Sequence, residues 1–145
     1  MTMDIAAYLS RYPREVAFGA EEADAVFDRY HTADFVLRND GMELDRAKLI
    51  AHVRPARKRA KDVRVEVHES VTTGDRVAAH YTLTADMASG TTIATEIYMF
   101  GRLSADGRLE RIDQITRDVS TRRAQANQAS SASASPASDP PSEAA

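Results

Sequence analysis

The chain has 145 residues, among them 19 Lys or Arg, 22 Asp or Glu and no Cys, and its formal net charge is -3. This length suits one domain, and the slightly acidic balance argues against a general affinity for nucleic acid or anionic membranes. The lack of cysteine excludes disulfides, thiolate metal sites and cysteine nucleophiles. Because no leader and no long apolar run is present, we expect a cytoplasmic protein that makes no membrane contact.

Helical spacing of apolar residues marks the first two elements. Ile5, Tyr8 and Leu9 predict a short amphipathic helix over residues 4–11, which Pro13 should stop. A second helix is expected from Glu21 to Tyr30. It should turn four side chains toward the core: Ala25, Val26, Phe27 and Tyr30.

The next stretch predicts one strand and one helix. The strand runs from Asp34 to the turn at Asp40-Gly41 and places Phe35, Leu37 and Asn39 on one side. Asp45 suits the N-cap of the helix, and Pro55 should break it. The run 54–64 holds six Lys or Arg residues and could bind phosphate. We favour a solvated helix face, because no aromatic residue interleaves the run for base stacking.

The second half, residues 63–117, predicts four consecutive strands. Apolar and polar residues alternate from Val63 to His68 and again from Val77 to Thr84, which is the period of a β-strand. Turn signals at Gly74, Gly90 and Gly107 separate the runs. The prediction is an antiparallel meander, and with the helical first half it gives an α+β fold.

The third strand of this meander has bulky side chains on both faces, because residues 97–100 are consecutively apolar. The helices can cover one face only, so we expect a homodimer that covers the other. The fourth strand puts Ile112, Gln114 and Thr116 on one face and Asp113 on the other. From about Ala124 onward the chain is rich in Ala, Ser and Pro, which predicts one domain over 1–120 and a disordered tail over 121–145.

The residues give little support to metal or cofactor chemistry. The four histidines, at positions 31, 52, 68 and 80, are widely spaced and form no pair on one helix face. No Gly-rich phosphate loop follows a strand, and no Gly-x-Ser-x-Gly motif is present. We therefore expect neither a metal nor a cofactor.

Acid-base chemistry in an apolar pocket is the remaining catalytic option. His80 titrates near neutral pH and is the first candidate, although a lone strand histidine is more often structural. Asp40 and Asp113 are the candidate carboxylates. Asp40 could instead bond its own turn, and Asp113 could pair with Arg111 or Arg117. Glu96, which flanks an apolar strand, could likewise be either catalytic or structural.

Three segments of the sequence resemble those of a known family. YHTADFVLRNDG is similar to the helix end and first strand of the nuclear transport factor 2-like superfamily, TTGDRVAAHYTLTADM to a later strand, and IYMFGRLSADGRLERIDQITRD to its last hairpin. The resemblance covers about residues 5–119 and is strongest to SnoaL-like domains, whose relatives include polyketide cyclases and ketosteroid isomerases. It implies a cone-shaped, curved antiparallel sheet wrapped around N-terminal helices, the cystatin-like α+β roll, commonly dimerised through the sheet.

The resemblance also implies a hydrophobic cavity inside the cone, with Tyr8 and Tyr30 near its mouth. Its expected lining is Phe35, Leu37, Asn39, Ala78, His80, Thr82, Ile97, Met99, Ile112, Gln114 and Thr116. The ligand would be a small apolar organic molecule whose polar end is oriented by His80, Asn39 and Gln114.

The chain departs from the catalytic patterns of the superfamily. The isomerase base corresponds to Asn39, with Asp40 one residue late, and the isomerase oxyanion-hole acid corresponds to Met99. Of the limonene epoxide hydrolase set Arg76 is retained, whereas Ala78 and Gln114 replace its aspartates. A cyclase-type base would be Asp113, if a bulge turned it inward.

Two hypotheses follow from these residues. The first is a small-molecule-binding domain, with or without isomerase, cyclase or dehydratase activity by proton transfer next to a carbonyl. The alternative is a non-catalytic ligand-binding or dimerisation accessory protein.

Overall fold

The computed structural model describes residues 3–120. The expected tail over 121–145 lies outside the described residues. In chain order the elements are α1 (Ile5–Phe18), α2 (Ala23–Tyr30), β1 (His31–Asn39), β2 (Met42–Asp45), α3 (Arg46–Arg59), β3 (Ala60–Thr73), β4 (Arg76–Met87), β5 (Thr92–Leu103) and β6 (Leu109–Asp118).

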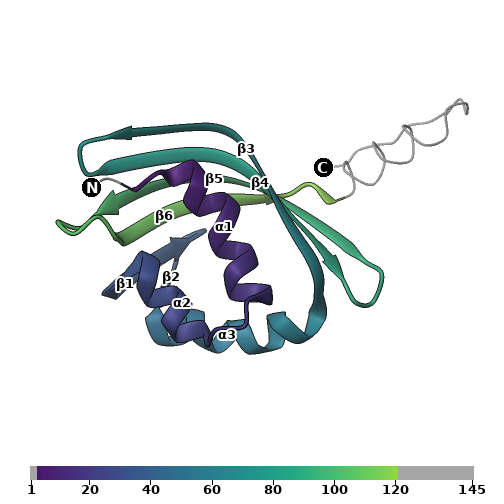
Figure 1. Cartoon of the computed structure of the whole chain (residues 1–145). Coiled ribbons are helices and arrows are strands. Elements are labelled where there is room, and N and C mark those ends of the chain that lie inside the picture. Colours follow the sequence, from purple (N-terminus) through teal and green to yellow (C-terminus); the bar gives the residue numbers. More distant parts are fainter. Residues whose placement is uncertain (1–2, 121–145) are drawn as a thin grey trace, which may run out of the picture.

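One curved sheet contains all the described strands, in the order β2-β1-β6-β5-β4-β3. The last four strands form the antiparallel meander that the sequence predicts, and β1 joins it by pairing in parallel with β6. The three helices lie on the concave side of the sheet (Figure 1). The α+β class and the cone-like sheet around N-terminal helices are therefore confirmed. We call the concave side the inner face and the opposite side the outer face.

Strand β2 is an addition to the predicted elements, and β1 begins at His31, earlier than the expected Asp34. The turn between β1 and β2 has two consecutive residues with positive φ, Asp40 at 51° and Gly41 at 88°. Two such residues build the tight turn whose twist matches a hairpin. The Asp40-Gly41 signal thus folds the chain back as a hairpin, where we had expected only the end of a strand.

Both prolines predicted to end helices lie inside them. Helix α1 continues past Pro13 to Phe18, and α3 includes Pro55. Proline removes one backbone hydrogen bond, but tertiary contacts can hold the next turn. Arg14, directly after Pro13, donates to Asp62 Oδ1 at 2.8 Å and to the Val63 carbonyl at 2.6 Å. These contacts tie the end of α1 to β3 and explain why the helix persists.

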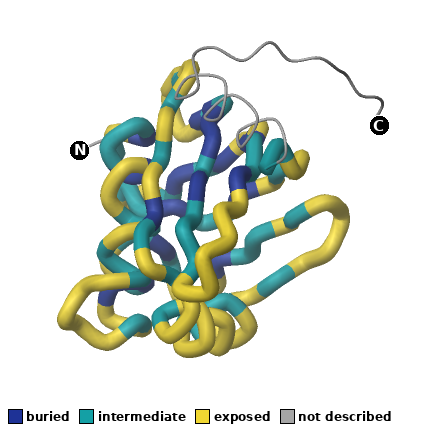
Figure 2. Tube along the Cα trace, turned by 90° about the vertical axis from the view of Figure 1, so that its right-hand side faces the viewer, coloured by how far each residue is buried: buried dark blue, intermediate teal, exposed yellow. Residues whose placement is uncertain are grey.

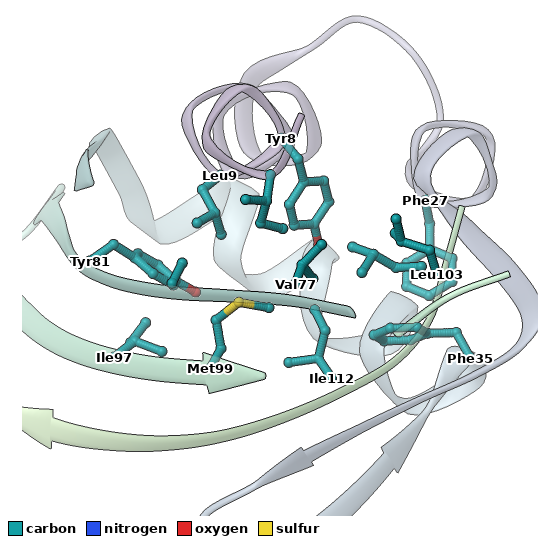
Figure 3. Close-up of a cluster of buried hydrophobic side chains, with 13 residues drawn as sticks. Tyr8, Leu9, Phe27, Phe35, Val77, Tyr81, Ile97, Met99, Leu103 and Ile112 are labelled. Atoms are coloured by element: carbon teal, nitrogen blue, oxygen red, sulfur yellow. The ribbon is translucent and has the colours of Figure 1, made fainter. Parts of the chain in front are cut away.

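The core lies between the helices and the inner face of the sheet (Figure 3). Figure 2 shows buried stretches along the strands and exposed residues at the turns and on the outer sides of the helices. Helix α2 turns Val26 and Phe27 inward, as predicted. Ala25 was also predicted to face this core but is exposed, because it lies outside the buried side of the helix. The core cluster comprises Ile5, Tyr8, Leu9, Phe27, Phe35, Val77, Ala79, Tyr81, Ile97, Met99, Leu103, Leu109 and Ile112.

Strand β4 faces the opposite way from our prediction. Val77, Ala79 and Tyr81 belong to the buried core, so the intervening side chains point to the outer face. Ala78, His80 and Thr82 therefore do not line the interior. The physical reason is that Val77, Ala79 and Tyr81 bury more apolar surface than the alternating set does. The sequence already shows this difference between the two sets.

A bulge at His68 bends β3 between its two halves. Val67 pairs with Tyr81 and Glu69 with His80, which leaves His68 as the extra residue on its strand. Such a bulge increases local bend and twist. The ring of His68 stays on the outer face, where its Nε2 lies 2.8 Å from Thr82 Oγ1. The long β3–β4 pair can therefore curve around the helices without losing its pairing.

A buried histidine links α1, α2 and β1. His31 Nδ1 lies 2.8 Å from the Phe27 carbonyl, which can only accept, so Nδ1 carries the proton. His31 Nε2 then accepts from the Tyr8 hydroxyl at 2.7 Å. Burial lowers the pKa of His31 to about 4. The ring is neutral at pH 7 and joins the first helix to the first strand.

This pair predicts an acid-sensitive stability. Below its ordinary pKa of 6.5 His31 gains a proton in the unfolded chain but stays neutral in the folded chain down to about 4. The free energy of unfolding should therefore fall by about 2–3 kcal/mol between pH 7 and pH 4.5. Urea denaturation across this range measures it. His31→Asn should flatten the dependence and His52→Gln, on exposed α3, should keep it; equal slopes in wild type and His31→Asn would refute the assignment.

Candidate functional site

The inner face carries a polar pair where β1 and β6 run side by side. Asn39 and Gln114 are opposite each other in the parallel register, and Gln114 Nε2 donates to Asn39 Oδ1 at 2.9 Å. Both are half-buried, as is Leu37 on the same side of β1. The expected meeting of Asn39 with Gln114 is thus observed. Each amide retains hydrogen-bonding capacity that a ligand can use.

Asp40 lies at the edge of this region and is held by β6. Its carboxylate accepts from the Thr116 backbone N–H at 2.8 Å and from Thr116 Oγ1 at 2.5 Å. These hydrogen bonds lower the pKa of Asp40 below its ordinary value, in an exposed position. A carboxylate stabilised in this way is a weak base, and its contacts are those of a residue that orders the turn.

Helix α3 covers the same end of the inner face loosely. No residue of α3 is fully buried, and Leu49 and Ile50, which pack against the core, are only half-buried. The half-buried apolar side chains that pack against the core at this end are Leu37, Leu49 and Ile50. This end of the interior therefore has apolar surface that is incompletely covered.

The two ends of α3 are fixed by arginines. Arg46 makes a two-pronged contact with Asp28 of α2, with both distances at 2.9 Å. Arg57 donates to the Val16 carbonyl at 2.6 Å and to the Glu21 carbonyl at 2.9 Å. The helix is thus held at its ends while its middle is weakly packed, which suits a cover over a binding region.

A cleft of about 640 Å³ separates α2 from α3. Its wall includes Ile50, which also packs against the core. Acidic and basic side chains line its outer part: Glu22, Asp24, Arg54 and Arg57. A cleft of this size suits a small organic molecule.

His80 belongs to a hydrogen-bonded group on the outer face. Its Nε2 lies 2.7 Å from Glu96 Oε2, and Arg117 Nη2 donates to Glu96 Oε1 at 2.6 Å. Hydrogen bonds from His80 and Arg117 lower the pKa of Glu96 to about 2. Tyr98 stacks on His80 with ring centroids 4.1 Å apart. The structure thus places His80 away from Asn39 and Gln114, and the predicted convergence of the three is wrong.

The third candidate, Asp113, is also on the outer face. It is exposed and lies opposite Phe100 in the β5–β6 pairing. Its expected partners are engaged elsewhere, since Arg111 lies 3.6 Å from Glu43 and Arg117 binds Glu96. No bulge turns Asp113 inward, because the pairing is regular from Thr95 to Arg102.

The remaining predicted lining residues divide between core and surface. Phe35, Ile97, Met99 and Ile112 are buried in the core cluster. Tyr30 packs edge-on against Tyr8, and its hydroxyl donates to Glu15 at 2.6 Å. Tyr30 is thus fixed between α1 and α2.

Two arginines of the basic run over residues 54–64 make contacts within the protein. Arg57 bonds α1 and the loop after it, and Arg64 pairs with Asp62 and Asp86.

Within residues 3–120, no group of three or more His, Asp or Glu side chains is arranged to hold a metal ion. None of the helices in that range is long and apolar enough to span a membrane.

Chemically, the Asn39–Gln114 pair can hydrogen-bond a polar group, whereas the predicted acid-base residues are either on the outer face or engaged in the turn. Sequence reasoning missed two features of this interior. The Tyr8–His31 pair joins residues 23 positions apart and left no local pattern. Tyr81 was read only as an apolar strand residue, although its phenol is a polar group on an otherwise apolar face.

Known structures share this fold at low sequence identity. AclR from Streptomyces galilaeus, a candidate hydroxylase, is 17% identical with a TM-score of 0.61, over 78% of this chain and 87% of that one. IdmH from Streptomyces antibioticus, a candidate polyketide cyclase, is 16% identical with a TM-score of 0.62, over 84% and 95%. An M. tuberculosis LEH-like epoxide hydrolase is 16% identical with a TM-score of 0.59, over 78% and 79%. At these identities the likeness establishes the fold alone.

The sequence itself provides the family assignment. None of the curated proteins compared with this chain matches it. A family model described as the SnoaL-like domain matches residues 9–112, which is most of the chain. The protein therefore belongs to the SnoaL-like domain family.

Proposed function

We propose that the protein binds a small apolar organic molecule between α3 and the inner face of the sheet. The observation that carries the proposal is the loose cover: α3 is fixed at both ends, has no fully buried residue, and shares Ile50 between the core and the wall of the cleft beside α2. Half-buried apolar side chains there would gain burial from a ligand. The Asn39–Gln114 pair would orient the ligand's polar end.

Binding is better supported than proton-transfer catalysis. His80 and Asp113 are on the outer face, and Asp40 has a lowered pKa and is held by Thr116. A general base needs both access to the substrate and a pKa near the working pH. Both hypotheses from the sequence include ligand binding, and these positions support the binding part of each more than an isomerase, cyclase or dehydratase activity. The names of the structural neighbours, a cyclase and an epoxide hydrolase among them, agree with an organic ligand.

The test of the binding proposal uses 1-ethylnaphthalene as an apolar probe. Wild type should bind it, and Ile50→Glu should weaken binding by more than about tenfold, because the probe would have to enter past a charge. Ala51→Trp narrows the same cleft without adding charge and should also weaken binding. Isothermal titration calorimetry gives the dissociation constants.

The matched control is His52→Glu, which places the same charge on an exposed position of α3. It should leave the dissociation constant unchanged. Equal binding by wild type, Ile50→Glu and Ala51→Trp would contradict the proposed site, and no binding by wild type would contradict the proposed function.

We also propose that a second copy of the chain covers the outer face. Four large apolar side chains are exposed there on neighbouring strands, which is uncommon on the surface of a monomer. They border or adjoin a shallow groove of about 230 Å³ that includes His80. A twofold dimer would bring this patch against its own copy. The four residues and their exposed fractions are Val71 57%, Tyr98 51%, Phe100 71% and Ile115 68%.

Sedimentation equilibrium at micromolar concentration tests the dimer. Wild type should sediment as a dimer, and Phe100→Asp should sediment as a monomer because each subunit would bury a charge against the other. Met42→Asp is the matched control, since Met42 is 59% exposed but lies on β2 at the far edge of the sheet. A monomeric wild type would overturn this proposal, as would a Phe100→Asp variant that stays dimeric.

A further inference from the structure

The exposed side of α3 carries cations without anions. Residues 46–61 hold seven Lys or Arg and no Asp or Glu, in a chain whose formal net charge is -3, so the rest of the chain is strongly acidic. Helix α3 lies at the lower edge of the molecule in Figure 1. We call its exposed cations, with the one that follows the helix, the basic patch: Lys48, Arg54, Lys58, Arg59 and Lys61.

The cations of the basic patch are not used inside the protein. Within residues 3–120, none of the five side chains makes an ion pair or a hydrogen bond. The other two cations of α3, Arg46 and Arg57, are the ones that fix the helix. Outside this stretch most arginines lie beside a carboxylate, namely Arg14, Arg29, Arg64, Arg76, Arg102, Arg108, Arg111 and Arg117. The basic patch is therefore free to meet an external anion.

The helix dipole explains only part of the basic patch. The C-terminal end of a helix favours cations, which accounts for Lys58 and Arg59 in the last turn. The N-terminal end favours anions, yet the first turn holds Lys48 and no acidic residue. Arg54 and Lys58 are four residues apart, a spacing at which like charges repel each other in a helix. Helix α3 thus keeps cations that cost stability, which is the pattern expected where they serve an interaction.

The surroundings of the basic patch restrict the kind of partner. Helix α3 has 14 residues, which is a length of about 21 Å. A membrane-bound helix has large apolar side chains beside its cations, whereas the exposed large apolar side chains of the described residues all lie outside α3. Nucleic acid would extend past this length over an acidic surface, and residues 46–61 contain no Phe, Tyr or Trp for base stacking. A short acidic protein segment meets both limits.

We infer that the basic patch of α3 docks an acidic segment of a partner protein. The attraction is between solvent-exposed charges, so it should fall steeply with salt. The inference does not depend on the proposed ligand, because Leu49 and Ile50 of α3 pack against the core while the patch is exposed. Arg54 also lines the cleft beside α2, and the variants below therefore leave it unchanged.

Fluorescence anisotropy with labelled peptides tests the inference. The probes are an alternating Glu-Ala peptide of about 15 residues, which as a helix matches the length of α3, and its uncharged Gln-Ala counterpart. At low ionic strength wild type should bind the Glu-Ala peptide alone, and about 0.3 M salt should remove most of this binding. The double variant Lys48→Glu plus Lys58→Glu should bind it roughly tenfold more weakly or worse, because both positions then repel the peptide.

Both substitutions suit the helix, so a loss of binding is not a loss of fold. Lys48→Glu places a carboxylate at the N-terminal end, and Lys58→Glu places one four residues after Arg54. The matched control is Arg11→Glu plus Arg38→Glu, which changes the net charge equally at exposed positions of α1 and β1. It should leave the dissociation constant as in wild type.

Three results would overturn the inference. The first is a wild type that does not bind the Glu-Ala peptide. The second is an equal loss of binding in the two double variants, which would show a response to overall charge. The third is tighter binding of single-stranded DNA of the same length, or of phosphatidylglycerol vesicles, since the partner would then be a nucleic acid or a membrane. None of these results bears on ligand binding under α3, which has its own test.

Discussion

Successive side chains of a strand point to opposite faces of a sheet, and in β4 and β5 both faces carry large groups. This constraint divides the chemistry of the protein in two. The inner set of β4 and β5 includes Tyr81, Ile97 and Met99 and packs under the helices, whereas the outer set includes His80, Tyr98 and Phe100. A residue cannot serve both faces. The assignment of a face to β4 therefore decides whether His80 meets a ligand inside the cone or a partner outside it.

The helices depend on the same division. Helix α1 seals one part of the inner face through Ile5, Tyr8 and Leu9, and the Tyr8–His31 bond fixes it to β1. Helix α3 covers another part but is held mainly by the arginines at its ends. The interior is thus tightly packed under α1 and loosely covered under α3. This difference in packing, more than any single polar residue, is what makes the region under α3 the candidate binding region.

Much of the fold could be predicted because it depends on local patterns. Alternation and glycine turns gave the four strands of the meander, and Asp45 was correctly placed as the N-cap of α3, where its side chain accepts from the Lys48 N–H. The helices that pass Pro13 and Pro55 could not be predicted locally. Contacts such as that of Arg14 with Val63, 49 positions away, override the proline signal.

The candidate site was predictable only in part, for a physical reason. Phe35, Leu37 and Asn39 share a face because the period of a strand is two, and their meeting with Gln114 follows once β1 pairs with β6. For β4 the alternation offered two faces, and choosing the one with His80 favoured a reactive group over the larger apolar set. Burial of Val77, Ala79 and Tyr81 was the stronger effect.

The central claim is that the inner face binds a ligand and the outer face binds a second copy of the chain. A crystal structure of the protein soaked with 1-acetonaphthone tests it most directly. The account predicts the naphthalene ring between α3 and the inner face, its carbonyl oxygen within hydrogen-bond distance of the Asn39 or Gln114 side-chain amide, and the outer faces of two chains in contact. Probe bound in the outer groove beside His80, with the interior closed and the patch around Phe100 open to solvent, would contradict it.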